Sequence, residues 1–234
     1  MKILAIDSSN LVMGVAVNDE GSVLGELITN VKKNHSIRLM PAIEQLLKDV
    51  DLKPKDLDRI AVAMGPGSYT GVRIGVTIAK TLAWTLNKDL VGISSLEVLA
   101  QNGRYFDGYI IPFFDARRGQ VYTGIYENRK GNVKRVEDDR LTLLDKWLKH
   151  LVKYEKPLLF LGNDLEKHRQ TIKNVCGTLA VLPETTMNNP RASEIARLSI
   201  DRPAVSNVHQ FVPQYLQLAE AEAKWIANQK RSCT

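Results

Sequence analysis

The stretch GPGSYTGVRIGVTIAKTLAWTL, residues 65–86, contains the strongest pattern in the chain. It opens with a glycine-led turn and continues as a helix. Two nucleotide-binding motifs begin in a similar way, and neither matches. The dinucleotide fingerprint needs a glycine where this chain has Thr70, and the P-loop needs a lysine well before Lys80. This segment therefore does not predict a phosphate-binding loop.

Small residues recur every four positions along this helix, at Gly67, Gly71, Gly75, Ala79 and Ala83. Residues at this spacing share one face, which another backbone can approach closely. Each glycine in a helix interior costs about 1 kcal/mol relative to alanine, so Gly71 and Gly75 need a packing reason.

A second stripe, which is apolar, runs beside the first at Ile74, Ile78, Leu82 and Leu86. A helix that is apolar nearly all round is normally buried nearly all round. Because a helix on a sheet buries one face, we expect a partner to cover the other face. In the alternative interpretation, the helix lies centrally in the chain's own fold and its glycines face the sheet.

The bulk composition is typical of a globular protein: 234 residues, 44% of them hydrophobic and 25% charged. No apolar run reaches the roughly 18 residues of a membrane span, and the run before Asp7 is too short for a secretory signal. Cys176 and Cys233 show neither metal-ligand spacing nor a disulfide framework. We expect a cytoplasmic protein without a membrane span.

The net charge of +6 permits contact with a polyanion such as RNA. The basic residues are spread along the chain, and no aromatic-and-basic motif of the known RNA-binding folds is present. Arg117 and Arg118 are candidates for binding a phosphate or an acidic partner, and a solvated pair is the plainer interpretation. A direct RNA-binding module is thus a secondary hypothesis.

The two halves of the chain share one predicted order, in which three strands are followed by alternating helices and strands. The first strand ends at Asp7 in one half and at Asp115 in the other. The predicted strands are 3–7, 12–17, 23–28, 59–64, 90–93, 109–114, 121–126, 133–136, 157–161 and 179–182. The predicted helices are 39–50, the segment after Gly65, 142–151, the segment after Gly162, 191–200 and 219–229.

This order predicts a duplicated α/β architecture with a boundary near residues 102–107. The N-terminal lobe is assigned residues 1–103 and the C-terminal lobe residues 104–234, whose last helix is a candidate for packing back on the first lobe. Asn34 or Ser36 is the expected cap of the first helix, and Pro41 is expected to bend it.

Five motifs, in order along nearly the whole chain, are similar to those of the TsaB family (older name YeaZ), a subunit of the bacterial machinery that makes threonylcarbamoyladenosine in tRNA. Two of them are highly specific, residues 65–75 and the sequence DARRGQVY at residues 115–122. The weaker ones are residues 6–9, His35 and Ser36 with Leu39 and Pro41, and residues 213–216. Gln217 departs from the pattern, since the family often has arginine there.

The resemblance implies the actin/hexokinase/Hsp70-like fold with two similar lobes of βββαβα type. It also implies a heterodimer with the catalytic paralogue TsaD, an ATPase, TsaE, that joins the complex, tRNA bound through the complex, and a homodimer in isolation. The helices after His35 and Gly67 would form the interface. The residues expected there are His35, Leu39, Ile43, Leu46, Tyr69, Gly71, Arg73, Gly75, Thr77, Ala79, Lys80 and Trp84.

The resemblance also addresses catalysis. TsaD-like chains carry a metal-binding His-x-x-x-His where this chain has Ser95 and Leu99, and leucine cannot ligate a metal. We therefore expect a noncatalytic subunit. A small-molecule phosphotransferase of the sugar or acyl kinase type is the alternative within the same fold, and a peptidase lacks both the metal and the nucleophile motif.

Nucleotide binding is a separate question. In the superfamily, aspartates that end the first strand of each lobe hold Mg²⁺ near the nucleotide phosphates, so Asp7, Ser8 and Asp115 are the candidate cofactor-binding residues, with ATP and Mg²⁺ as ligands within the complex. In the alternative interpretation both aspartates cap turns. The loop at Gly162 has one glycine where the superfamily usually has two, which counts against ATP binding by the chain alone.

Overall fold

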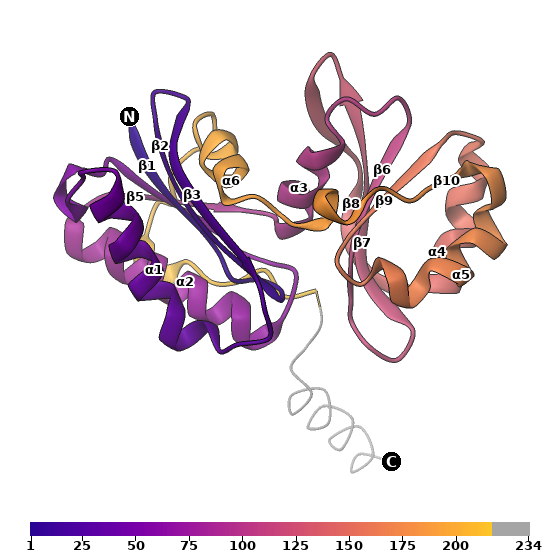
Figure 1. Ribbon diagram of the computed structural model, residues 1–234, viewed down its shortest axis with the longest axis horizontal. Helices are drawn as coiled ribbons and strands as arrows, with labels where there is room; N and C mark the ends of the chain where they lie inside the picture. The colour runs from indigo at the N-terminus through magenta and orange to yellow at the C-terminus, as the bar shows by residue number, and fades with distance from the viewer. Residues whose placement is uncertain (217–234) are drawn as a thin grey trace, which may run out of the picture.

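The computed structural model describes residues 1–216, which form two lobes of the same topology (Figure 1). Each lobe is built on a five-stranded sheet with three antiparallel strands and two parallel ones. The strand order is β3-β2-β1-β4-β5 in the first sheet and β10-β9-β6-β7-β8 in the second, so the two orders are equivalent. The predicted duplicated α/β fold is confirmed.

The elements of the first lobe are β1 (Lys2–Asp7), β2 (Val12–Asp19), β3 (Ser22–Asn30), α1 (His35–Asp49), β4 (Arg59–Ala63), α2 (Tyr69–Leu86) and β5 (Asp89–Ile93). The elements from there to the last strand are α3 (Ser95–Ala100), β6 (Tyr109–Asp115), β7 (Gln120–Arg129), β8 (Asn132–Leu143), α4 (Leu144–Leu151), β9 (Leu158–Leu161), α5 (Leu165–Cys176) and β10 (Ala180–Val181). The helix α6 (Ala192–Ser199) follows.

The alternation of β1 shows how each sheet buries both faces. Leu4 and Ile6 belong to the core under α1 and α2, whereas Ile3 and Ala5 belong to the core under α6. Successive side chains of a strand point to opposite faces, so a continuous apolar strand needs cover on both sides.

The helix that follows the last strand of each lobe packs against the sheet of the other lobe. Leu96 and Leu99 of α3 lie in the core of the second lobe, and Ala192 and Ile195 of α6 lie in the core of the first. In Figure 1, α3 and α6 lie between the two sheets, while the pairs α1–α2 and α4–α5 cover the outer faces. The predicted second lobe, residues 104–234, included α6. In the structure α6 packs on the sheet of the first lobe and completes that lobe instead.

After α6 the chain continues along the first lobe as the C-terminal strap, residues 201–216. The backbone N–H of Val205 donates to the carbonyl of Leu90 on the edge strand β5 at 2.9 Å, and the N–H of Gln214 donates to the carbonyl of Met64 at 2.7 Å. Phe211 lies against Gly92, where a Cβ atom would come within 2.6 Å of its ring. The strap therefore covers one edge of the first sheet.

Some predicted boundaries change. The helix after Gly65 begins at Tyr69, since residues 65–68 form the turn and the Ser68 hydroxyl accepts from the Gly71 N–H. Asn34 is the cap of α1, accepting from the Ser36 N–H at 3.0 Å. The sequence did not predict α3. The predicted helix 219–229 and Gln217 lie outside the described residues, and no helix within residues 1–216 is long and apolar enough to cross a membrane.

Candidate partner-binding site

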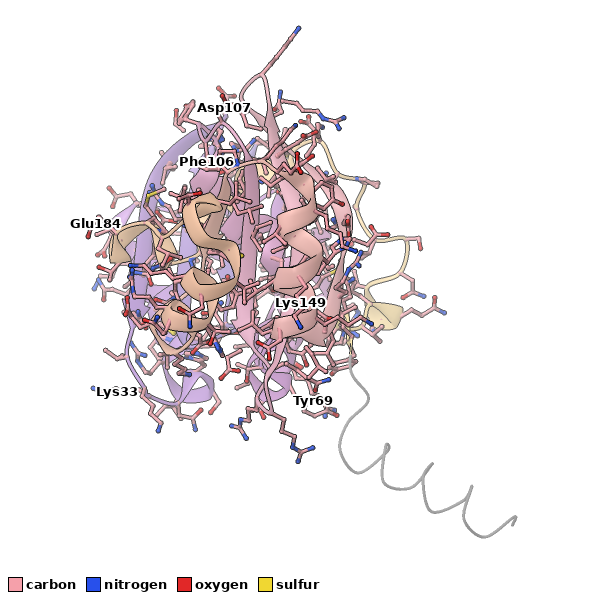
Figure 2. All side chains as sticks on the ribbon, turned by 90° about the vertical axis from the view of Figure 1, so that its right-hand side faces the viewer. Lys33, Tyr69, Phe106, Asp107, Lys149 and Glu184 are labelled. Carbon is pink, nitrogen blue, oxygen red and sulfur yellow. The ribbon has the colours of Figure 1, made fainter. Side chains whose placement is uncertain are left out.

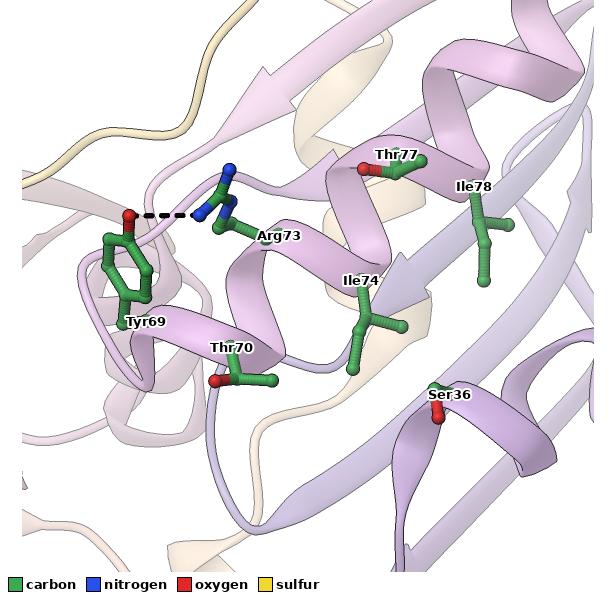
Figure 3. Close-up of a pocket in the computed structure, with 7 residues that line it drawn as sticks. All are labelled: Ser36, Tyr69, Thr70, Arg73, Ile74, Thr77 and Ile78. Atoms are coloured by element: carbon green, nitrogen blue, oxygen red, sulfur yellow. Dashed lines mark hydrogen bonds between the residues drawn. The ribbon is translucent and has the colours of Figure 1, made fainter.

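A groove lies between α1 and α2 on the outer face of the first lobe (Figure 3). Its volume is about 450 Å³. Apart from Ser36 of α1, its lining comes from one side of α2: Tyr69, Thr70, Arg73, Ile74, Thr77 and Ile78. These α2 positions follow the three- and four-residue spacing of one helix face, so the sequence presents them together.

Large apolar side chains are exposed on the two helices that form this groove. Ile37 and Met40 of α1 are 71% and 42% exposed, and Tyr69 and Trp84 of α2 are 45% and 64% exposed. Exposed apolar surface concentrated on neighbouring elements is typical of an interaction site. The groove is therefore the best candidate for contact with another protein.

The structure divides the twelve predicted interface residues by the face on which they lie. Leu39, Ile43 and Leu46 are buried in the lobe's own core. They are not available to a partner as packed here, which corrects that part of the prediction. Periodicity identifies the apolar face of a helix, and here the lobe's own sheet covers that face.

The small-residue stripe of α2 also faces the interior of the lobe. A Cβ atom on Gly71 would lie 2.2 Å from the carbonyl oxygen of Ser8, and one on Gly75 would lie 2.6 Å from the Ser8 hydroxyl. Ala79 is also buried. This stripe therefore follows the alternative interpretation, in which the glycines face the sheet. In this packing Gly71, Gly75 and Ala79 are not available to a partner, which corrects their assignment to the interface.

Tyr69, Arg73 and Thr77 are exposed and line the groove. The Arg73 guanidinium donates to the Tyr69 hydroxyl at 2.9 Å, as the dashed line in Figure 3 shows. The Tyr69 ring also lies 5.2 Å from the ring of Tyr215 in the strap. These contacts order the exposed face of α2 at its N-terminal end.

Lys80 and Trp84 contact the chain's own strap. The Lys80 ammonium donates to the carbonyl oxygens of His209 and Phe211 at 2.9 and 2.7 Å. Trp84 meets the His209 ring edge-on at 5.5 Å between centroids. Part of α2 is thus covered from within the chain, a cover that the sequence analysis missed because it joins residues more than 120 positions apart.

His35, also predicted at the interface, is half-buried at the start of α1. Its Nε2 atom donates to the carbonyl of Asn10 at 2.8 Å, while its Nδ1 is buried without a partner among the described residues. His35 therefore ties the beginning of α1 to the turn between β1 and β2.

The candidate cofactor residues of the first lobe are buried. Asp7 accepts hydrogen bonds from the backbone N–H and the hydroxyl of Ser9 at 2.8 and 2.7 Å, through one carboxylate oxygen. Its other oxygen has no partner among the described residues. Burial raises the pKa of Asp7 above its usual value, against the opposing hydrogen bonds from Ser9 and the charge of His35. Ser8 donates to the carbonyl of Gly71.

Asp115 has the equivalent position in the second lobe. Its carboxylate accepts from the N–H of Arg117, two residues on, just as Asp7 accepts from Ser9. Lys167 and His168 lie 3.6 and 3.8 Å away. This is the geometry of an Asx turn, so both aspartates take the turn-capping role of the alternative interpretation.

The loop at Gly162 is also engaged within the chain. The Gly162 N–H donates to the side chain of Asn188 at 3.0 Å, and the Asn163 amide donates to the carbonyl of the same residue. Among residues 1–216, no three His, Cys, Asp or Glu side chains group as metal ligands. The hydrogen bonds that Asp7, Ser8 and Asp115 make within the chain give each of them a structural role in its turn.

A buried polar network between the lobes was not predicted. Asp139 accepts from the Ser94 hydroxyl at 2.5 Å and from the Tyr126 hydroxyl at 2.6 Å, with Arg135 at 3.4 Å. Burial, together with the charge of Asp139, raises the pKa of Tyr126 well above its usual value. Since Ser94 caps α3, the network fixes that helix on the second sheet.

Comparisons with known proteins place these features in a family. A family model described as "TsaD: tRNA N6-adenosine threonylcarbamoyltransferase" matches residues 22–225. The chain is 54% identical to the tRNA threonylcarbamoyladenosine biosynthesis protein TsaB of Bacillus subtilis (strain 168), over 98% of this chain and 100% of that one. It is 31% identical to the protein of the same name from Escherichia coli (strain K12), over 61% of this chain and 62% of that one.

Two solved structures show the same fold. YeaZ from Pseudomonas aeruginosa superposes with a TM-score of 0.77 at 24% identity, covering 92% of this chain and 99% of that one. A ROK hexokinase from Thermus thermophilus superposes with a TM-score of 0.51 at 10% identity, covering 86% and 100%. These likenesses support the actin/hexokinase-like fold, and together with the identity to the Bacillus protein they show that the chain belongs to the TsaB family.

Proposed function

We propose that the chain is a noncatalytic subunit of the complex that forms threonylcarbamoyladenosine in tRNAs reading ANN codons. It acts by pairing with a TsaD-like catalytic paralogue through the groove between α1 and α2. The names of its relatives support the pathway, and the exposed groove supports the mode of action.

The observation that carries the pairing is the exposed apolar surface of the two helices. Ile37 and Met40 on α1 and Tyr69 on α2 are large exposed side chains. Ile74 and Ile78 add apolar surface to the lining of the groove. The fully buried centre of a protein interface needs such surface, and aromatic residues, Met and Arg are enriched there. Arg73 supplies a charged group on the same face.

The occupant we favour is the paralogue, because a chain with the same lobes can offer an equivalent pair of helices and complete a helix bundle across the groove. A second copy of this chain can use the same surface when the paralogue is absent. Binding of a TsaE-like ATPase would then follow formation of the heterodimer. The proposal assigns this chain no chemical step through a metal or nucleotide.

Deletion of the gene, followed by mass spectrometry of nucleosides from bulk tRNA, tests the function. We expect threonylcarbamoyladenosine to be lost and to return with the wild-type gene. Unchanged modification in the deletion strain would refute the proposal. Size-exclusion chromatography of the chain mixed with the paralogue tests the mode of action separately.

A further inference from the structure

The second lobe has a groove where the duplicated topology predicts one. α4 and α5 occupy the positions that α1 and α2 occupy in the first lobe. The hollow between them has a volume of about 530 Å³. Its lining consists of Gly119, Leu143, Leu144, Asp145, Lys146, Lys149, His168 and Thr171.

The two grooves differ in charge. In the first, Arg73 is the one ionised group among the lining residues. In the second, Lys146 and Lys149 stand on one wall and His168 on the other, with Asp145 as the one lining carboxylate. Asp115 and Asp164, which lie near His168 and the start of α5, are already paired with Lys167.

A row of lysines extends this positive surface along α4. Lys146, Lys149 and Lys153 follow i, i+3, i+7 spacing, and the last lies in the single turn that continues the helix. All three are exposed, and none forms an ion pair with another residue in the described part of the chain. Their spacing puts them on one face, over about 10 Å of helix axis.

We propose that this basic groove, lined by Lys146, Lys149, His168 and Thr171 and extended by Lys153, binds the sugar–phosphate backbone of tRNA. The inference rests on the proposed function, in which tRNA is the substrate of the complex. Lysine ammonium groups bind phosphates as point charges, and the Thr171 hydroxyl adds a donor. Each phosphate neutralised releases counterions, so such a row contributes affinity without reading sequence.

An RNA backbone fits the groove better than an acidic protein segment does. A protein interface needs an apolar centre, and Leu143 is the one exposed large apolar residue among those that line the groove. The position of the basic groove also allows the paralogue and tRNA to bind at the same time. Lys149 lies on the face turned toward the viewer in Figure 2, whereas Tyr69 lies at the lower edge, so the paralogue and tRNA would occupy different sides.

The test uses the complex of the chain with its paralogue and unmodified tRNA, with affinity measured across a range of salt concentrations. For Lys146→Glu with Lys149→Glu, we expect at least a tenfold loss of affinity, and the slope of log K against log salt should fall by about 1.5. Lys130→Glu with Lys134→Glu, on the hairpin formed by β7 and β8, makes the same change in net charge and should keep the wild-type slope.

Three results would overturn the proposal. The first is a wild-type salt slope in the groove variant, and the second is an equal loss of tRNA affinity in the groove and control variants. The third is a groove variant that no longer binds the TsaE-like ATPase but keeps its tRNA affinity. The milder pair Lys146→Gln with Lys149→Gln covers the case in which charge reversal disturbs folding. If the chain and paralogue fail to co-elute, or deletion leaves the modification unchanged, the proposed function fails. If the chain and paralogue co-elute and deletion abolishes the modification, but the groove variant keeps the wild-type salt slope, this inference fails alone.

Discussion

The hydroxyl of Ser8 donates a buried hydrogen bond of 2.8 Å to the carbonyl oxygen of Gly71, 63 residues further along the chain. This bond joins the turn after β1 to the first turn of α2. The Ser8 carbonyl lies so close to Gly71 that no side chain fits between them. The glycine motif therefore serves the lobe's own packing, and this allows α2 to turn its other face outward.

Gly71→Ala should destabilise the protein by about 1–3 kcal/mol, because its methyl group would lie 2.2 Å from the Ser8 carbonyl and the backbone would have to shift. Thr77→Ala, on the exposed face of the same helix, should change stability by about 0.5 kcal/mol or less. Urea unfolding of both variants is the measurement. Equal stabilities would show that the close packing at Gly71 is not what the structure indicates.

Met40→Glu and Thr77→Arg should each weaken binding to the paralogue at least tenfold, or about 1.4 kcal/mol. Met40→Glu places a charge on the exposed apolar surface of α1, and Thr77→Arg places one in the groove. Neither should shift the unfolding midpoint. Trp84→Glu is a poorer test, because Trp84 also packs on His209.

Tyr105→Glu is the matched control for these groove variants. Tyr105 is also an exposed large apolar residue, and its neighbours Phe106 and Asp107 lie at the opposite end of the molecule from Tyr69 (Figure 2). Calorimetric titration with the paralogue should give wild-type affinity for this variant. If Tyr105→Glu weakened binding as much as the groove variants, the surface would have to be sought elsewhere.

Lys80→Ala should loosen the strap, because its ammonium group holds two strap carbonyls. We expect a loss of about 1–2 kcal/mol and faster hydrogen exchange at the N–H groups of Val205 and Gln214. Lys48→Ala removes an exposed lysine of α1 and should leave exchange in the strap unchanged. Unaltered exchange in Lys80→Ala would mean that Phe211 alone secures the segment.

Asp139→Ala should cost about 3 kcal/mol, since it leaves the Ser94 and Tyr126 hydroxyls and Arg135 without their buried acceptor. Its neighbour provides the control, because Asp138 is 91% exposed and Asp138→Ala should be nearly neutral. Thermal unfolding of both variants compares them, and similar midpoints would argue against a role for the network in stability.

Asp7→Asn should change how stability depends on pH. The pKa of Asp7 is raised in the folded state, so the native protein binds this proton more tightly than the unfolded chain does. The contribution of Asp7 to the free energy of unfolding therefore falls as pH rises from about 4, the unfolded value, through the folded pKa. Urea unfolding from pH 4 to 7 should show the wild type losing stability relative to Asp7→Asn, and parallel curves would contradict the burial of the charge.

Local patterns explain why the sheets could be predicted from the sequence. The run of residues 3–7 and the turn before β3 are set by neighbouring residues, and the same is true of their counterparts after Tyr109. The helix α3 has six residues, too few for helical periodicity to show. Its exchange with α6 depends on contacts between distant segments, which no local pattern contains.

The candidate site shows the same limit. The resemblance implied a partner interface on the helices after His35 and Gly67, and in the structure Tyr69, Arg73 and Thr77 line the groove between α1 and α2. Leu39 and Gly71 were assigned to the partner because an apolar or small-residue stripe does not state what covers it. Lys80 and Trp84 each contact the strap, and these contacts join segments too distant for a local pattern to contain.

The exchange of α3 and α6 has a consequence for the order in which the protein can mature on the ribosome. One face of the first sheet, which includes Ala5, Ala16 and Val91, is covered by Ala192 and Ile195. That face stays uncovered until translation has passed residue 199. Although N-terminal domains generally fold first during synthesis, the first lobe of this chain has to wait for α6, which follows the whole second sheet in the sequence. The apolar face of the first sheet thus stays open in the nascent chain while the second lobe is being synthesised.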